Sequence, residues 1–275
     1  MSNPSESSLP SEAPGRDEPL LEPGSLLAQV RDYWNAHVHD LEMTRHAPGT
    51  REFFQDLDAY RFDKLRYLPR LVDFAGYRGR RLLEVGCGIG IDLARFARGG
   101  ARVTGVDLSR TAIALARRHL ELAGLSARLQ VANGEQLPFE AESFDLVYAH
   151  GVLQYTADPA AMARECRRVL VPGGAAIFMV YNRYSWLTAM SKLTRVELEH
   201  QDAPVLRTFS SGELCRLLAP FREIRIVPER FPVASRLHRG WKAALYNQMF
   251  VPAFEVLPRA VVRPFGWHLM AFCRC

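Results

Sequence analysis

Hydrophobic and polar positions alternate along the central part of the chain in a way that predicts strands and helices in turn. Short apolar runs bounded by glycine or polar residues indicate buried strands, and the segments between them repeat apolar residues at helical spacing. The predicted strands cover residues 82–85, 102–106, 127–131, 144–149 and 175–181, and a V-P-G-G turn precedes the last of them. The predicted helices cover residues 90–98, 109–123 and 158–170.

Strands that alternate with helices across short turns run parallel and are joined by right-handed crossovers. We therefore expect an α/β fold with a Rossmann-like, doubly wound, mostly parallel sheet and helices on both faces. Residues 267–272 are expected to form an antiparallel last strand. Because ligands of such sheets bind beyond the carboxyl ends of the strands, the functional residues are expected in four places, at residues 86–90, 107, 133–136 and 150–155.

The segments outside residues 81–182, the expected core, have weaker patterns. Residues 1–24 are rich in Pro, Ser and Glu, which predicts a disordered tail, and residues 25–80 have the spacing of a helical cap. Residues 183–275 are expected to complete the same domain with helical inserts on its acceptor side. Their aromatic and basic stretch at 231–265 either lines an acceptor pocket, contacts a membrane surface, or packs as a helical pair that completes the core.

Composition excludes several classes of protein without selecting one. The 275 residues can form one large domain, and no apolar run of about 18 residues predicts a membrane-spanning helix. The N-terminus lacks the basic-then-apolar order of a signal peptide, so a cytoplasmic location is expected. The net charge of +5 comes from scattered arginines. The five cysteines have no metal-ligand spacing, so we expect reduced thiols and no metal site.

A glycine-rich loop follows the first predicted strand in the stretch LLEVGCGIGIDLARF. A dinucleotide fingerprint needs glycine at position 91, where this chain has Ile91, and no Gly-Lys-Ser/Thr follows that would make a P-loop. The pattern is instead E-x-G-x-G-x-G, from Glu84 to Gly90. Asp107 ends the second strand, where a carboxylate accepts hydrogen bonds from both hydroxyls of a ribose.

These motifs, together with VANGEQLPF and SFDLVYAHGVLQYTADPAAMARECRRVLVPGG, resemble those of the class I S-adenosylmethionine (SAM) dependent methyltransferases. The resemblance covers residues 81–181 and is closest to the type 11 group related to ubiquinone and menaquinone methyltransferases. It implies SAM as methyl donor, with S-adenosylhomocysteine (SAH) as product. The implied contact residues are Glu84, Gly86, Cys87, Gly88, Gly90, Asp107, Leu108, Asn133, Gly134, Glu135 and His150. Asn133 stands where the family commonly has an acidic residue for the adenine amine, and it accepts that bond without charge assistance.

The acceptor side is less well defined by the resemblance. Adenine- and amide-modifying relatives carry Asp/Asn-Pro-Pro-Tyr after the fourth strand, where this chain has YAHG, so DNA is not expected as a substrate and RNA is disfavoured. His150 is the candidate general base, or it only packs against the methionine part of SAM through its backbone. Relatives often have a His-His pair where this chain has Gln154 and Tyr155, which puts a family-derived base in doubt.

Other residues are candidates for contact with the acceptor. The first helix carries Tyr33, Trp34, His37 and His39, which either close over the site or simply pack. Tyr155, Tyr181 and Asn182 are placed to line the acceptor pocket. Arg61 either meets a carboxylate or is a solvated charge.

The sequence therefore predicts an enzyme that transfers a methyl group by SN2 displacement to an O, N or C nucleophile of a small molecule in secondary or cofactor metabolism. Two alternatives stay open: a methyltransferase acting on protein, lipid or RNA, and a SAM-binding domain without transfer activity. Membrane contact and the oligomeric state are not decided by the sequence.

Overall fold

The computed structural model describes residues 22, 24–37, 40–194, 200–233, 241, 244 and 246–275. The predicted tail, apart from residues 22 and 24, lies outside the described residues, as do His39 and residues 234–240 of the aromatic insert.

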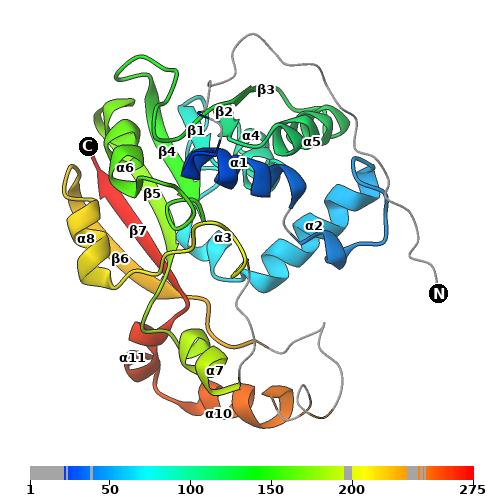
Figure 1. Cartoon of the computed structure of the whole chain (residues 1–275), viewed down its shortest axis with the longest axis vertical. Helices are drawn as coiled ribbons and strands as arrows, with labels where there is room; N and C mark the ends of the chain where they lie inside the picture. Colours follow the sequence, from blue (N-terminus) through cyan, green and yellow to red (C-terminus); the bar gives the residue numbers. More distant parts are fainter. Residues whose placement is uncertain are drawn as a thin grey trace.

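Seven strands form one sheet in the order β3-β2-β1-β4-β5-β7-β6 (Figure 1). Their bounds are β1 Arg81–Val85, β2 Arg102–Asp107, β3 Ala127–Val131, β4 Phe144–His150, β5 Leu170–Tyr181, β6 Arg222–Glu229 and β7 His268–Arg274. Strands β1 to β5 pair in parallel, and β7 runs antiparallel to both β5 and β6. The expectation of a mostly parallel sheet with an antiparallel last strand is confirmed.

Successive residues of the central strands face opposite sides of the sheet, as the two-residue period of a strand requires. Leu83 and Val147 pack in one core with helices α6 (Pro159–Arg168) and α8 (Ser211–Leu217). Their neighbours Leu82 and Leu146 pack in a second core with α4 (Ile91–Arg98) and α5 (Arg110–Leu122) on the other face. Because both faces are buried, the central strands are mostly apolar, with Glu84 of β1 as a buried exception.

The predicted helical cap consists of α1 (Leu26–Ala36), the 3-10 helix η1 (Leu41–Met43), α2 (Arg51–Lys64) and α3 (Leu68–Leu71). Ser25 and Thr50 begin α1 and α2 by accepting hydrogen bonds from the amides of Ala28 and Phe53. Phe53, Phe54 and Leu57 of α2 pack against Ile91 of α4 and Leu115 of α5. This small core fixes the cap beside the carboxyl ends of β1 and β2.

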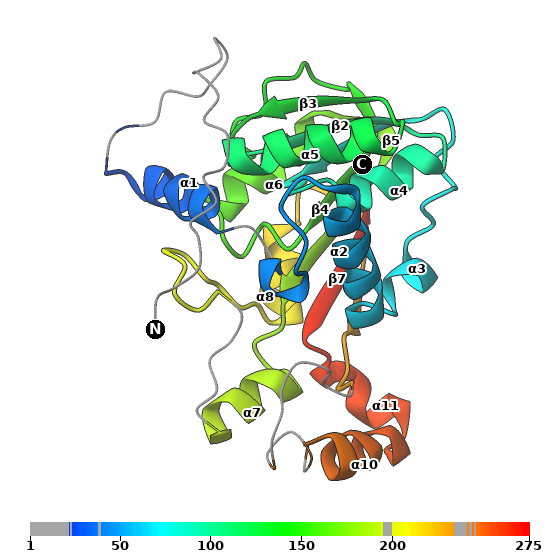
Figure 2. The same cartoon turned by 90° about the vertical axis from the view of Figure 1, so that its right-hand side faces the viewer.

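The C-terminal helices gather away from the sheet, below it in Figures 1 and 2. They are α7 (Trp186–Thr194), the π-helix η2 (Tyr246–Phe250), α10 (Val251–Val256), α11 (Arg259–Val262) and the 3-10 helix η3 (Arg263–Phe265). The Trp186 ring lies 6.4 Å from that of Tyr246 and 6.1 Å from that of Phe250. Ser210 and Glu213 form a capping box at the start of α8.

The V-P-G-G stretch does not turn the chain into β5, so that prediction is wrong. Strand β5 already begins at Leu170 and runs through the stretch, where the pairing with β4 shifts between Leu170 and Ala175. Gly173 adopts φ +74°, and the amide of Cys275 donates to the carbonyl of Gly174 at 2.9 Å. The stretch is therefore a bulge that remains paired with the end of the chain.

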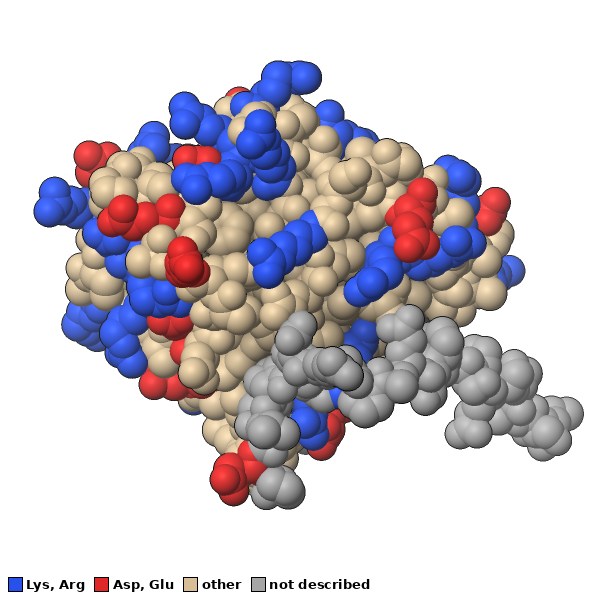
Figure 3. Space-filling model, turned by 90° about the horizontal axis from the view of Figure 1, so that it is seen from above, with Lys and Arg blue, Asp and Glu red and all other residues tan. Residues whose placement is uncertain are grey.

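Among the described helices, none combines the length and hydrophobicity needed to cross a bilayer. On the face drawn in Figure 3, Lys and Arg side chains form several separate groups with Asp and Glu between them. This distribution agrees with the scattered arginines of the sequence.

Candidate active site

A cavity of about 240 Å³ lies at the carboxyl edge of the sheet and is also lined by residues of α1 and α2. All four predicted places contribute lining residues, which are Gly86, Cys87, Gly88, Ile89, Asp107, Asn133, Gly134, His150, Gly151, Val152 and Tyr155; the neighbouring Leu108 and Thr156 and Glu84 of β1 also line the cavity. The rule that ligands bind beyond the strand ends therefore located the cavity correctly. No described residue from 231–265 is part of the lining.

Each glycine of the loop after β1 has a separate physical reason to lack a side chain. Gly86, Gly88 and Gly90 all adopt positive φ, of +69°, +52° and +77°. A Cβ at Gly86 would lie 2.3 Å from Cγ2 of Val152, and one at Gly90 would lie 3.3 Å from Cβ of Ala116. A Cβ at Gly88 would meet nothing within 4 Å, because this glycine faces the cavity. Gly86 and Gly88 both line the cavity, but of the two only Gly88 has open space where a Cβ would stand, and Gly90 lies outside the lining.

The carboxyl groups of Asp107 and Glu84 line the cavity near the glycine loop. Asp107 accepts hydrogen bonds from the amides of Gly88 (2.9 Å) and Ser109 (2.8 Å), one on each oxygen. Burial outweighs these bonds and raises its pKa. Glu84 is 4% exposed, its Oε2 has no hydrogen-bond partner, and burial raises its pKa well above the usual range. A buried, unpartnered carboxyl oxygen is expensive to maintain unless a ligand supplies a donor.

The loop expected to meet adenine is held by its own side chains. The Asn133 side-chain oxygen accepts from the amide of Glu135 at 2.9 Å, so the accepting atom already makes one bond. Gly134 lines the cavity, but Glu135 does not. Its carboxylate instead accepts hydrogen bonds from the Thr156 hydroxyl and the Asp158 amide. Glu135 thus secures the loop after β4 and does not face the cavity.

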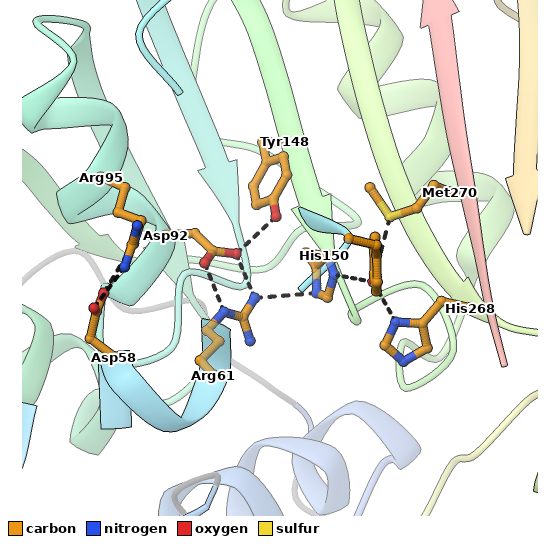
Figure 4. A network of polar contacts seen from close by, with 9 residues as sticks. Asp58, Arg61, Asp92, Arg95, Tyr148, His150, His268 and Met270 are labelled. Atoms are coloured by element: carbon orange, nitrogen blue, oxygen red, sulfur yellow. Dashed lines mark hydrogen bonds and ion pairs between the residues drawn. The ribbon is translucent and has the colours of Figure 1, made fainter. Parts of the chain in front are cut away.

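Arg61 meets a carboxylate of the protein itself, that of Asp92, and is therefore not a solvated charge. Its Nε and Nη2 donate to the two oxygens of Asp92 at 2.7 and 2.5 Å, and Tyr148 adds a third donor at 2.8 Å (Figure 4). Burial alone would raise the pKa of Asp92, but the Arg61 charge outweighs it and the pKa is lowered. A parallel pair joins Arg95 to Asp58 between the same two helices, α4 and α2, at 2.7 Å.

His150 lies at the end of β4, between Arg61 and Tyr67. Its Nδ1 is 3.3 Å from Nη2 of Arg61, and its Nε2 is 3.3 Å from the Tyr67 hydroxyl. Burial, reinforced by the Arg61 charge, lowers the pKa of His150 to about 3. Such a weakly basic imidazole takes up a proton poorly at neutral pH. The surroundings of His150 therefore do not support its expected role as general base.

Three polar residues near His150 were not anticipated from the sequence: Tyr67, Arg230 and His268. The Tyr67 hydroxyl lies 2.6 Å from Nδ1 of His268, and Nη1 of Arg230 lies 3.0 Å from its Nε2. Arg230 and His268 both line the cavity. The sequence contained one signal for His268. Because the last strand is antiparallel, its first residue, and not its last, lies at the carboxyl edge of the parallel strands.

The candidate acceptor residues are only partly brought together. His37, Tyr155 and Tyr181 line the cavity, as does Trp34. Tyr33 does not; its ring stacks on His37 with centroids 4.1 Å apart, and its hydroxyl donates to Asp202 at 2.9 Å.

Asn182 also lies outside the lining, which corrects its assignment to the acceptor pocket. Its side-chain nitrogen donates to the carbonyls of Pro264 (2.9 Å) and Gly266 (2.8 Å), so the residue ties the end of β5 to the start of β7. A buried amide with two backbone partners has a structural role in this position.

Comparison with known proteins was made on the sequence and on the fold. Residues 83–178 of the core match the family described as "Methyltransferase domain". Among curated relatives, the ubiquinone biosynthesis O-methyltransferase of Cereibacter sphaeroides is 32% identical over 57% of this chain and 61% of its own length. The protein of the same name from Methylocella silvestris is 34% identical over 55% and 59%.

Solved structures share the fold of the methyltransferase domain at lower identity. Magnesium protoporphyrin IX methyltransferase from Synechocystis, solved with bound SAH, has a TM-score of 0.60 and 14% identity over 90% of this chain and 98% of its own. A SAM-dependent methyltransferase from Mesorhizobium loti has a TM-score of 0.54 and 23% identity over 78% of this chain and all of its own. The chain spans about three fifths of the length of the curated relatives it matches.

Proposed function

We propose that the protein is a SAM-dependent methyltransferase that methylates a small molecule in cofactor or secondary metabolism. One observation carries the proposal: the bare backbone of Gly88 and the carboxylate of Asp107 meet in one cavity and are joined by a 2.9 Å hydrogen bond. The names of the curated relatives, which are O-methyltransferases, favour an oxygen nucleophile. Their alignment with just over half of this chain supports a methyltransferase core and does not identify the acceptor.

The residues present fit SAM at three points. The open space in front of Gly88 accepts a ligand atom where a side chain would stand. The oxygens of Asp107 have lone pairs left for two ribose hydroxyls after accepting one amide each. The unpartnered Oε2 of Glu84 fits a donor such as an ammonium group. Asn133 and Gly134 would lie against the base.

When bound, SAM supplies a methyl carbon that the positive charge of its sulfonium has already activated. The protein then has to bind, orient and exclude water, which accounts for much of the rate enhancement in such reactions. Gly88 and Asp107 fix one end of the cavity. Trp34 of α1 and Leu57 of α2 line it from the cap, and Tyr155 and Tyr181 are further lining residues. The cap is thus part of the site and not an appendage.

Calorimetric titration with SAH tests the proposal directly, and Asp107→Ala is the decisive variant. Hydrogen bonds to a charged group contribute about 1.5–3 kcal/mol each, so the loss of two ribose contacts should raise the dissociation constant at least about 100-fold. Asp145→Ala is the matched control, because Asp145 also accepts a backbone amide, from Arg81 at 2.8 Å, but lies at the opposite edge of the sheet. Absence of SAH binding by the wild type at micromolar concentration overturns the proposal.

Two other functions make different predictions for the same protein. A SAM-binding domain without transfer activity binds SAH but methylates no member of a panel of small acceptors. A methyltransferase acting on RNA binds RNA with a steep dependence on salt, because phosphate contacts release counterions. The separate groups of Lys and Arg in Figure 3 disfavour that alternative.

A further inference from the structure

Helix α1 lies beside α5 at the carboxyl edge of the sheet (Figures 1 and 2). Leu27, Val30 and Trp34 of this helix line the cavity, with the spacing of residues that share one helical face. Asn35 lies outside the lining, and its side chain contacts the start of α5. One face of α1 thus belongs to the cavity, and the neighbouring face holds the helix against the core.

Asn35 serves as a second cap for α5. The first amides of a helix have no acceptor within the helix and need one from elsewhere. Ser109, the N-cap of α5, accepts from the Ala112 amide at 3.1 Å. The side-chain oxygen of Asn35 accepts from the two preceding amides, of Arg110 at 2.9 Å and of Thr111 at 3.5 Å. The first turn of α5 is therefore completed by a side chain that belongs to α1.

Ser109 extends this contact to the loops expected to bind SAM. It is 1% exposed, and its hydroxyl donates to the Asn35 oxygen at 3.0 Å. Its amide donates to one oxygen of Asp107 at 2.8 Å, and the amide of Gly88 donates to the other at 2.9 Å. Successive hydrogen bonds thus join α1 to the glycine loop. Because donors on both oxygens orient the Asp107 carboxylate, loss of the Asn35 contact loosens the group expected to hold the ribose.

Helix α1 also contacts the segments that follow β4 and α7. The Trp34 ring lies 5.0 Å from that of Tyr155 in an edge-to-face arrangement. The Tyr33 hydroxyl donates to Asp202 at 2.9 Å. Since Tyr155 lines the cavity, α1 reaches from the residues beside Asp107 to the cavity wall that follows β4. A change in the position of α1 therefore affects both parts of the site.

We propose, on the basis of the function proposed above, that Asn35 is a positioning residue that couples the docking of α1 to the binding of SAM. A ligand shifts an equilibrium between two positions of a helix only if it interacts differently with the two. A ligand that fills the cavity contacts the lining residues of α1 only while this helix is docked. Binding therefore stabilises the docked helix, and the docked helix keeps Asp107 oriented through Asn35 and Ser109. Departure of the ligand then requires α1 to undock.

Hydrogen exchange of the full chain, measured with and without saturating SAH, tests whether α1 responds to the ligand. We expect SAH to slow the exchange of amides in residues 26–36 at least about tenfold, because α1 then undocks only at the expense of bound ligand. Residues 200–203, which include the hydrogen-bond partner of Tyr33, should gain protection as well. Protection confined to residues 86–90 and 107–109 overturns the proposal. If SAH does not bind, the proposed function fails instead.

Dissociation rates of SAH from variants of α1 assign the effect to Asn35. Asn35→Leu removes the accepting oxygen, and we expect SAH to dissociate at least about tenfold faster, the effect of about one hydrogen bond. Asn35→Asp keeps an accepting oxygen at the N-terminus of α5, where a carboxylate is favourable, and should retain most of the slow dissociation. Dissociation from Asn35→Asp as fast as from Asn35→Leu overturns the proposal.

Gln29→Leu is the matched control for these rates. Gln29 is an exposed amide side chain on the same helix, and it donates to the carbonyl of Gly24. This variant should release SAH at the wild-type rate. A role of Asn35 in stability alone would lower the folded fraction and leave the dissociation rate of the folded protein unchanged. Equal rates for Asn35→Leu and Gln29→Leu therefore contradict the proposal.

A double-mutant cycle tests the connection through Ser109. If Asn35 acts by orienting Asp107, its effect on the dissociation constant of SAH depends on the presence of that carboxylate. The factor by which Asn35→Leu weakens SAH binding should then be at least about threefold smaller in the Asp107→Ala background than in the wild type. Additive effects overturn the proposed coupling, because they give Asn35 and Asp107 independent roles.

Discussion

The buried ion pair between Arg61 and Asp92 permits a sharp test of how the cap is held. Arg61→Gln leaves the Asp92 carboxylate buried, since its side chain is 1% exposed, with Tyr148 as its remaining side-chain donor. Removing one partner of a buried pair costs about 3–5 kcal/mol. The Arg61 side chain keeps 26% of its surface exposed, so we expect the lower end of this range, about 3 kcal/mol, in the free energy of unfolding from urea titrations.

The neighbouring pair supplies the control within the same two helices. Arg95 and Asp58 are also joined through both Nε and Nη2, but their side chains are 32% and 26% exposed. Solvated pairs contribute about 0–1 kcal/mol, and Arg95 also lies over the Phe62 ring at 3.5 Å. Arg95→Gln should therefore cost only about 1 kcal/mol. The comparison isolates burial, because residue types, helices and geometry are matched.

The pH dependence of the Arg61→Gln variant provides a second check. In the wild type the pKa of Asp92 is lowered, so the pair contributes stability that is lost as the pH falls through that low value. In the variant, burial without Arg61 raises the pKa of Asp92 above its unfolded value. Protonation then relieves the penalty, and the difference from the wild type should shrink between about pH 7 and about pH 4. Equal losses for the two arginine variants, or a difference independent of pH, refute the reasoning.

Two further predictions concern the glycine loop and His150. Gly88→Ala should lower SAH affinity, because its Cβ enters the cavity, and should cost about 1–2 kcal/mol in stability, because the residue has a positive φ. Gly86→Ala should cost more stability, because its Cβ would also clash with the Val152 side chain. Equal urea midpoints for the two variants would contradict this prediction. Because the folded pKa of His150 is about 3, its unfolded form takes up a proton first as the pH falls, so this residue lowers stability by up to about 2 kcal/mol between about pH 6.5 and about pH 5. His150→Asn should remove that part of the acid sensitivity in urea titrations, and an unchanged pH slope would show that the ring is protonated in the fold.

The parts of the fold that depend on local patterns were predictable from the sequence. Buried strands such as β1 and β4 are continuous apolar runs, and the order of strands and helices leaves few ways to connect them. The V-P-G-G stretch misled because its composition is typical of a turn. Its actual conformation depends on pairing with Cys275, at the far end of the chain, which no local pattern contains.

The same division applies to the site. Asp107 ends β2 and Gly88 lies in the loop that follows β1, so their positions at the sheet edge were predictable from the sequence. Arg61 pairs with a residue 31 positions away, and that pairing depends on how α2 docks against α4. Arg230 and His268 reach the cavity only because β7 reverses direction. The sequence predicts that reversal, and the reversal places His268, the first residue of β7, at the carboxyl edge of the parallel strands.

The two ends of the cavity differ in charge in a way that follows from strand order. Carboxyl groups stand at the end served by β1 and β2, where Glu84 lacks a partner and Asp107 faces the loop. Arg230 stands at the end served by β6 and β7. The neutralised pair of Arg61 and Asp92 lies between them and contributes little net field. On the function proposed above, a positively charged donor bound beside Glu84 and Asp107 would favour the ionised form of both carboxyl groups and so offset the effect of burial, which raises the pKa of each.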